Sequence, residues 1–246
     1  METQLVKTFI QGLDQDVLKG GIPSGHVVVI RGASGTMKTS LAYYVLHQNA
    51  LRGGPGLYVT FEQTAGGLLE HAESLGLSTN SASDNLPILD LSEGREQLTA
   101  TTRRMANSSG GRAATEDSVL SLLQSKIQDL HRRTNFSLLA IDSWSAIEAL
   151  LPTEDRRSQI FTFFEWLRSL GATTFVVSEP QRNGYDGIME EEVLCDGIFE
   201  LVMAPLSGTT FQRRIQCVKM RCVNHDNDIR SLLFEDGRFT VARAIG

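Results

Sequence analysis

The fold of this chain is decided by the stretch Val27-Val28-Val29-Ile30-Arg31-Gly32-Ala33-Ser34-Gly35-Thr36-Met37-Lys38-Thr39-Ser40-Leu41-Ala42. A run of β-branched apolar residues leads into a glycine-bearing loop, and a Lys-Thr pair then opens a helix with apolar residues at helical spacing. This order of strand, loop and helix is the context that a phosphate-binding loop, or P-loop, requires. The competing interpretation is a glycine-rich turn that has arisen by chance.

The loop matches the P-loop pattern G-x-x-x-x-G-K-[ST] except at one position, where Met37 replaces the second Gly. Loop N–H groups and the positive end of the helix would attract phosphate oxygens. Lys38 would neutralise the β- and γ-phosphates, and the hydroxyl of Thr39 would ligate Mg²⁺. We therefore expect a nucleotide site made by Gly32, Ser34, Gly35, Thr36, Met37, Lys38, Thr39 and Ser40.

Composition restricts the classes of function. The chain has 246 residues, of which 41% are hydrophobic, so it is long enough to bury a full core. Its 23 basic and 29 acidic residues give a formal net charge of −6. Phosphate contacts dominate DNA affinity, so this acidic balance disfavours a dedicated DNA-binding protein.

Cysteine usage and the apolar segments indicate the compartment. Cys195, Cys217 and Cys222 form no C-x-x-C pair, which favours buried free thiols over a metal site or a disulfide. The N-terminus lacks the pattern of a signal peptide. No apolar stretch approaches the roughly 20 residues that cross a bilayer. We expect a soluble, cytoplasmic protein that does not bind a membrane.

Strands and helices alternate along most of the chain. Buried strands are predicted at 56–61, 137–143 and 173–178, and a short strand at 86–90, where Pro87 suits a strand start or a sheet edge. Helices are predicted after the P-loop, after the capping residue Thr64, from 116 to 130, and from the capping residue Thr153 to Gly171. Short strands follow at 198–203, 211–219, 230–235 and 238–243. The pattern predicts an α/β fold with a doubly wound, mainly parallel sheet and an antiparallel C-terminal extension.

No repeat or linker divides the chain, so we expect one domain over residues 1–246. Residues 91–117 differ in character, because they form a polar tract that has almost no apolar periodicity. We interpret this tract as a mobile surface insertion. A regulatory or partner-binding loop is the alternative interpretation.

Two acids follow predicted strands, where ligands of such sheets bind. Asp142 ends an apolar strand, as a carboxylate that holds Mg²⁺ beside Thr39 would, although many strands end on an acid without this role. Glu62 ends the strand after the P-loop helix, where a carboxylate would polarise an attacking water. An ordinary strand-terminal acid explains Glu62 equally well.

The stretch Lys219-Met220-Arg221 ends a late strand. Two cations that flank a methionine are consistent with a solvated sheet edge. The alternative is that they reach a phosphate across a subunit interface, as arginine fingers do.

At this point the chain resembles a KaiC-type member of the RecA superfamily. The resemblance follows motifs in order over residues 6–243: Gly12-Leu13-Asp14, Gly20-Gly21-Ile22-Pro23-Ser24-Gly25, the P-loop, Tyr58-Val59-Thr60-Phe61-Glu62, Ile141-Asp142-Ser143, Cys195-Asp196-Gly197 and Val218-Lys219-Met220-Arg221. It implies a RecA-like ATPase that uses ATP and Mg²⁺ and assembles as a ring, usually a hexamer, with ATP between subunits. By motif position Glu62 resembles the catalytic glutamate, and Lys219 and Arg221 resemble residues offered in trans to the neighbour's phosphates.

The chain also departs from the family pattern. Gln63 stands where the family commonly has a second Glu, and one such domain is present where the clock proteins carry two. The phosphorylated Ser-Thr pair of the clock protein would fall near Glu192-Val193, which has no hydroxyl, so we do not expect autokinase activity. A circadian role does not follow from the resemblance.

Our leading hypothesis is a ring-forming P-loop ATPase that hydrolyses ATP slowly and acts as a regulatory switch. The alternatives are a nucleotide-binding scaffold without turnover and a RecA-like ATPase that handles DNA. The expected partners are further copies of the chain in a homo-hexameric ring, together with a regulatory protein that the sequence does not identify. The acidic balance argues against a nucleic acid partner.

Overall fold

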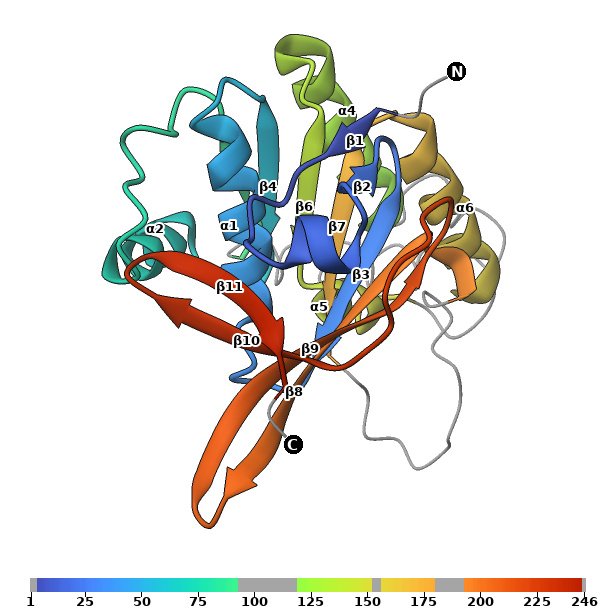
Figure 1. Ribbon diagram of the computed structural model, residues 1–246. Coiled ribbons are helices and arrows are strands. Elements are labelled where there is room, and N and C mark those ends of the chain that lie inside the picture. Colours follow the sequence, from blue (N-terminus) through green and yellow to red (C-terminus); the bar gives the residue numbers. More distant parts are fainter. Residues whose placement is uncertain (1–3, 93–118, 152–155, 180–192, 245–246) are drawn as a thin grey trace.

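The computed structural model describes residues 4–92, 119–151, 156–179 and 193–244, and it is built on a nine-stranded sheet (Figure 1). From edge to edge the strands are β11 (Arg238–Arg243), β10 (Arg230–Glu235), β9 (Thr210–Met220), β8 (Gly197–Ser207), β3 (Val27–Gly32), β7 (Thr173–Ser178), β6 (Leu138–Asp142), β4 (Gly56–Thr60) and β5 (Ile88–Asp90).

The sheet is parallel from β8 to β5 and antiparallel from β8 to β11. This arrangement confirms the predicted RecA-like α/β fold with an antiparallel C-terminal extension. Strands β4, β6 and β7 are buried along their whole length, as parallel strands covered on both faces are.

Helices cover both faces of the sheet (Figure 1). Helices α1 (Lys38–Ala50) and α2 (Ala65–Ser74) pack on one face, and α4 (Val119–Thr134), α5 (Trp144–Glu148) and α6 (Arg156–Ser169) pack on the other. Strand β3 contacts both helical layers. Val28 and Ile30 face the layer of α1 and α2, whereas Val27 and Val29 face the layer of α4, α5 and α6. The strand that leads into the P-loop is therefore fixed from both sides.

The local predictions were largely confirmed. Thr64 caps α2, since its hydroxyl accepts a hydrogen bond from the N–H of Gly67 at 3.1 Å. The short strand predicted at 86–90 is β5, which begins directly after Pro87 and lies at the edge of the sheet. Helix α5 was not predicted, because five residues are too short to show helical periodicity. Strands β8 and β9 are 11 residues each and so are longer than predicted.

Some predictions need correction, and others fall outside the described residues. Cys195 and Cys217 are buried free thiols as expected, whereas Cys222 is exposed. Most of the predicted insertion at 91–117 and the capping residue Thr153 lie outside the described residues. Within the described part of the chain, no helix is both long and apolar enough to cross a bilayer.

The N-terminal segment covers the edge of the sheet at β11. It contains β1 (Leu5–Val6), β2 (Ile22–Pro23) and a π-helical turn, η1 (Leu13–Val17), which the sequence did not predict. Gly12 lies so close to β11 that a Cβ atom there would stand 1.9 Å from the carbonyl oxygen of Val241. Glycine is therefore required where this segment meets the strand.

Candidate nucleotide site

The loop between β3 and α1 has the close-packed geometry of a P-loop. A Cβ atom on Gly32 would lie 2.4 Å from the carbonyl oxygen of Leu201 and 2.8 Å from Oγ1 of Thr36, so the turn admits only glycine. The loop ends at Lys38, the first residue of α1. The strand, the loop and the helix thus follow one another as the sequence predicts.

Met37 adopts the backbone conformation that glycine favours. Its φ is +72° and its ψ is 30°, in the left-handed region, and it is the N-cap residue of α1. Its side chain packs against the hydrophobic core under α1. The departure from the P-loop pattern at this position therefore leaves the path of the backbone intact.

A cavity of about 360 Å³ adjoins the loop at the carboxyl ends of β3, β4, β6 and β7. It brings together most of the predicted site residues with several that were not predicted. The lining residues are Ser34, Gly35, Met37, Lys38, Thr39, Ser40, Glu62, His71, Asp142, Ser143, Val177 and Glu179.

Lys38 is almost completely buried at the floor of this cavity, with 7% of its side chain exposed. Its Nζ donates hydrogen bonds to the carbonyl oxygen of Ala33 at 3.1 Å and to Oε1 of Glu179 at 3.0 Å. Glu179 follows β7, and its N–H is held by Oγ of Ser145 at 2.9 Å. The ammonium group expected at the phosphates is therefore paired with a carboxylate.

Asp142 is buried at the end of β6 and is surrounded by hydroxyl groups. The hydroxyl of Tyr58 donates to its Oδ2 at 2.7 Å, and Thr39 forms a second side-chain hydrogen bond. Burial raises the pKa of the Asp142 carboxyl above its usual value, although the bonds from Tyr58 and Thr39 act in the opposite direction. The carboxylate and the Thr39 hydroxyl together offer the oxygen ligands that Mg²⁺ prefers.

Glu62 lies at the exposed side of the cavity, just beyond β4. Its Oε1 accepts a hydrogen bond from Oγ of Ser143, the residue after Asp142. Ser143 also caps α5 by accepting the N–H of Ala146 at 3.3 Å. The carboxylate of Glu62 is thereby held next to Asp142, at the position where the sequence predicts a group that polarises water.

Lys219 and Arg221 do not line this cavity. They lie at the end of β9, whose Met220 pairs with Gly197 of β8, and Gly197 in turn pairs with Val28 near the start of β3. The P-loop begins at Gly32, about four residues further along β3 and roughly 13 Å away at the rise of a strand. Arg221 is thus too distant to contact phosphates bound by the loop of its own chain.

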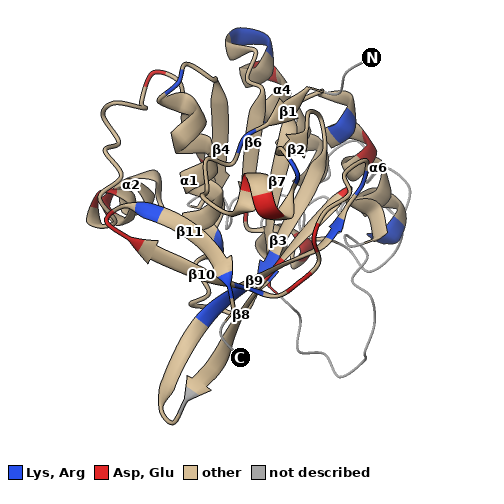
Figure 2. Ribbon diagram, viewed as in Figure 1, with Lys and Arg blue, Asp and Glu red and all other residues tan. Residues whose placement is uncertain are grey.

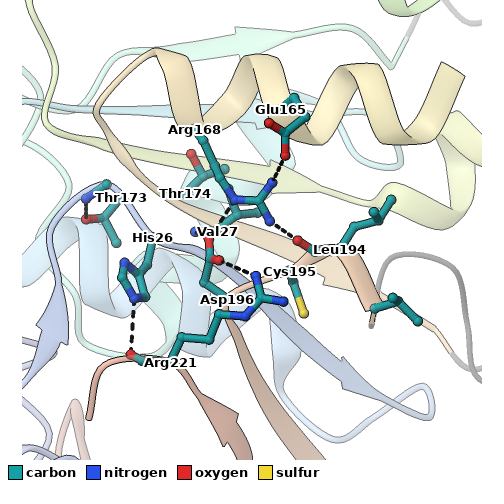
Figure 3. A network of polar contacts seen from close by, with 12 residues as sticks. His26, Val27, Glu165, Arg168, Thr173, Thr174, Leu194, Cys195, Asp196 and Arg221 are labelled. Atoms are coloured by element: carbon teal, nitrogen blue, oxygen red, sulfur yellow. Dashed lines mark hydrogen bonds and ion pairs between the residues drawn. The ribbon is translucent and has the colours of Figure 1, made fainter. Parts of the chain in front are cut away.

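Arg221 is fixed by a polar network around Asp196 (Figure 3), and Lys219 is bonded to the residue before Asp196. Asp196 Oδ1 pairs with Arg221 Nη1 at 2.9 Å, and its Oδ2 accepts bonds from the N–H of Val27 and from Nε of Arg168, each at 3.1 Å. Lys219 Nζ donates to the carbonyl oxygen of Cys195 at 2.7 Å.

This network lowers the pKa values of both Asp196 and Lys219, for different reasons. Burial alone would raise the pKa of Asp196, but the N–H of Val27 and the guanidinium groups of Arg168 and Arg221 outweigh it, so the pKa is lowered. Burial also lowers the pKa of Lys219, and the nearby Arg221 acts in the same direction. The pKa values of Asp196 and Lys219 therefore both depend on burial and on the charges of neighbouring side chains.

Sequence reasoning missed four polar residues around the cavity: His71, Ser143, Glu179 and Arg213. Ser143 ends one predicted strand and Glu179 directly follows another, so the rule that ligands bind at strand ends would have indicated both. Arg213 Nε reaches the carbonyl oxygen of Gly35 at 3.5 Å from β9. For Arg213 and His71 we find no local sequence signal.

A comparison with protein-family models identifies the relatives of this chain. The model described as "ATPase: KaiC" matches residues 6–242, which is nearly the whole sequence. The chain belongs to the KaiC family of ATPases.

Individual KaiC relatives agree with this assignment. The chain is 30% identical over 229 residues to the circadian clock oscillator protein KaiC of Picosynechococcus. The aligned region covers 90% of this chain and 41% of that protein. The chain is also 30% identical over 232 residues to KaiC 1 of Synechocystis, with the same coverage. The chain thus spans less than half the length of these curated KaiC proteins.

A solved structure shows the KaiC fold directly. A KaiC-like protein from Pyrococcus horikoshii superimposes with a TM-score of 0.78, covering 97% of this chain and 99% of that one. The sequences are 22% identical, so this likeness establishes the shared fold.

Proposed function

We propose that this protein binds Mg-ATP at residues 32–40 and hydrolyses it slowly, as a switch that reports its nucleotide state to a partner. One observation carries the proposal: Lys38, Glu62 and Asp142, which come from three separate elements, converge on a single cavity beside the P-loop. Membership of the KaiC family supports ATP as the nucleotide.

The residues of the cavity fit a magnesium-bound triphosphate. Lys38 would lie against the β- and γ-phosphates, while the Thr39 hydroxyl and the Asp142 carboxylate would hold Mg²⁺. Among the described residues no three His, Cys, Asp or Glu side chains are grouped so that they could hold a metal ion, so the proposed Mg²⁺ would take its remaining ligands from phosphate and water. The bound ion would neutralise charge that develops on the phosphates.

Glu62 is the group we assign to activation of the attacking water. Its carboxylate accepts the Ser143 hydroxyl, which fixes its orientation beside the proposed magnesium ligands. A positioned general base typically contributes about 10²- to 10⁴-fold to a rate. We assign hydrolysis rather than autophosphorylation, because Glu192-Val193 offers no hydroxyl.

We further propose that the site is completed by a second copy of the chain in a homo-hexameric ring. Lys219 and Arg221 lie at the opposite end of β3 from the P-loop, which agrees with a role toward a neighbour's phosphates. The far half of the β8–β9 hairpin projects from the body and carries no charged residue (Figure 2). Its exposed Met203, Leu206 and Phe211 form an apolar surface of the kind that contacts a partner.

Turnover of Mg-ATP by the wild type and by the Glu62→Gln variant tests the proposal, with the native mass measured for both. We expect the variant to lose about 10²- to 10⁴-fold in turnover while it retains its ATP affinity and its mass. Glu70→Gln is the matched control, because Glu70 is an exposed carboxylate of α2 that does not line the cavity. Equal turnover in wild type and Glu62→Gln would remove Glu62 from the mechanism.

A further inference from the structure

His71 joins the P-loop helix to α2 at the rim of the nucleotide cavity. Its Nε2 lies 3.0 Å from Oγ of Ser40, in the first turn of α1. Ser40 is buried, whereas His71 is exposed and lines the cavity. The pair therefore reaches from the buried base of the loop to the open side of the site.

The position of Ser40 along the loop indicates which part of a nucleotide lies nearest to it. In a P-loop the lysine reaches the β- and γ-phosphates, and the residue after it reaches the metal. These two positions are Lys38, which pairs with Glu179, and Thr39, which forms a hydrogen bond with Asp142. Ser40 is the next residue along α1, so it lies toward the end where the phosphates join the nucleoside.

The ring of His71 has the chemistry to contact a nucleoside. In the described part of the chain no protein group is bonded to its Nδ1, and the side chain is exposed to the cavity. An imidazole can donate or accept a hydrogen bond at a ribose hydroxyl or a base edge. Its flat face can also stack on a base, as aromatic side chains do in nucleic-acid binding proteins.

We propose that His71 determines affinity for the nucleoside half of the nucleotide, whereas the P-loop determines affinity for the phosphates. This proposal rests on the nucleotide site proposed above and adds a specificity-determining residue to it. The competing explanation is structural: the bond to Ser40 ties α2 to α1 and supports the loop itself.

The two explanations differ for a ligand that lacks a nucleoside. Calorimetry would measure binding of Mg-ATP and of Mg-tripolyphosphate to the wild type, His71→Ala, His71→Asn and Glu70→Ala. We expect His71→Ala to weaken Mg-ATP binding about tenfold, the effect of one good hydrogen bond or stacking contact, and to leave tripolyphosphate binding unchanged. His71→Asn, which keeps a donor and an acceptor, should recover part of the loss.

Glu70→Ala is the matched control, since it makes the same change at the neighbouring exposed position of α2. Its unfolding temperature and its affinity for both ligands should equal those of the wild type. Equal losses of Mg-ATP and tripolyphosphate binding in His71→Ala would show that His71 supports the loop, and this would overturn the inference. Unchanged binding of both ligands would overturn it as well. A wild type that binds neither ligand would instead refute the nucleotide site on which the inference rests.

Discussion

At the scale of single residues, Met37 shows that a P-loop can keep its backbone without its second glycine. The left-handed conformation of a residue other than glycine costs about 1–2 kcal/mol, which the packing of the Met37 side chain against the core offsets. Because the loop already follows the path that glycine would take, its N–H groups need no rearrangement to face phosphate.

This geometry predicts different results for two substitutions at position 37. Met37→Gly should bind Mg-ATP within about twofold of the wild type, because it keeps the backbone conformation. Met37→Val should lose roughly 1–2 kcal/mol of stability and bind Mg-ATP more weakly, since a β-branched residue resists positive φ. Calorimetry and chemical denaturation would measure both effects. A tenfold loss of binding in Met37→Gly would contradict the prediction.

Glu179 supplies a second prediction at this scale, because its carboxylate pairs with the Lys38 ammonium group that would otherwise be free to bind the phosphates. Removing this competition should raise the affinity for Mg-ATP severalfold in Glu179→Gln. Glu165→Gln is the matched control, as it breaks an ion pair with Arg168 on α6, remote from the cavity. Weaker Mg-ATP binding in Glu179→Gln would show that the carboxylate helps to hold the nucleotide.

The sequence predicted those site residues that a local pattern marks. Lys38 and Thr39 follow a loop motif, and Asp142 ends an apolar strand, so each could be found from its neighbours in the chain. The bonds of Glu179 to Lys38 and of His71 to Ser40 join residues 141 and 31 positions apart. The position of Glu179 after a predicted strand would have placed it near the cavity, but neither its pairing with Lys38 nor the bond of His71 to Ser40 has a local sequence signal.

At the scale of elements, Asp196 connects β8, β9, α6 and the start of β3 through a single carboxylate. In the folded protein its pKa lies below the usual value, so the carboxylate stabilises the fold at pH values above about 4. This contribution disappears as the pH falls through the lowered pKa.

Asp196→Asn should therefore change how stability depends on pH. At neutral pH we expect the variant to be about 1–3 kcal/mol less stable, because Arg168 and the N–H of Val27 lose a charged acceptor. Below about pH 4 the difference should shrink, since the wild type loses its own carboxylate there. Urea denaturation from pH 7 to pH 3 measures this. Asp129→Asn, in an exposed pair with Arg132, should remain near the wild type throughout.

The elements themselves were predictable where their periodicity is long. The strands at 137–143 and 173–178 were found because each contains an apolar run, at 138–141 and 175–177, as burial on both faces favours. Helix α5 and turn η1, of five residues each, were missed because one turn shows no period. The position of β3 between β8 and β7 is set by tertiary packing, and the order of elements along the chain does not specify it.

At the scale of the whole molecule, the separation of Lys38 from Arg221 makes the proposed sharing of the site testable. Lys38→Ala and Arg221→Ala should each be nearly inactive as pure proteins. Mixing them under conditions of subunit exchange should restore part of the ATP turnover, because some interfaces then contain an intact Lys38 opposite an intact Arg221. A mixture that stays inactive, or near-normal turnover by Arg221→Ala alone, would refute the assignment in trans.

The placement of the P-loop and of Arg221 at opposite ends of β3 has a consequence for how the protein responds to its own abundance. If the site is completed in trans as proposed, one chain cannot complete it by folding, and ATP turnover per subunit would depend on protein concentration. Dilution below the dissociation constant of the assembly would separate the subunits and abolish ATP turnover, with no inhibitor and no change in any residue. The amount of protein in the cell would then act as a threshold on the switch.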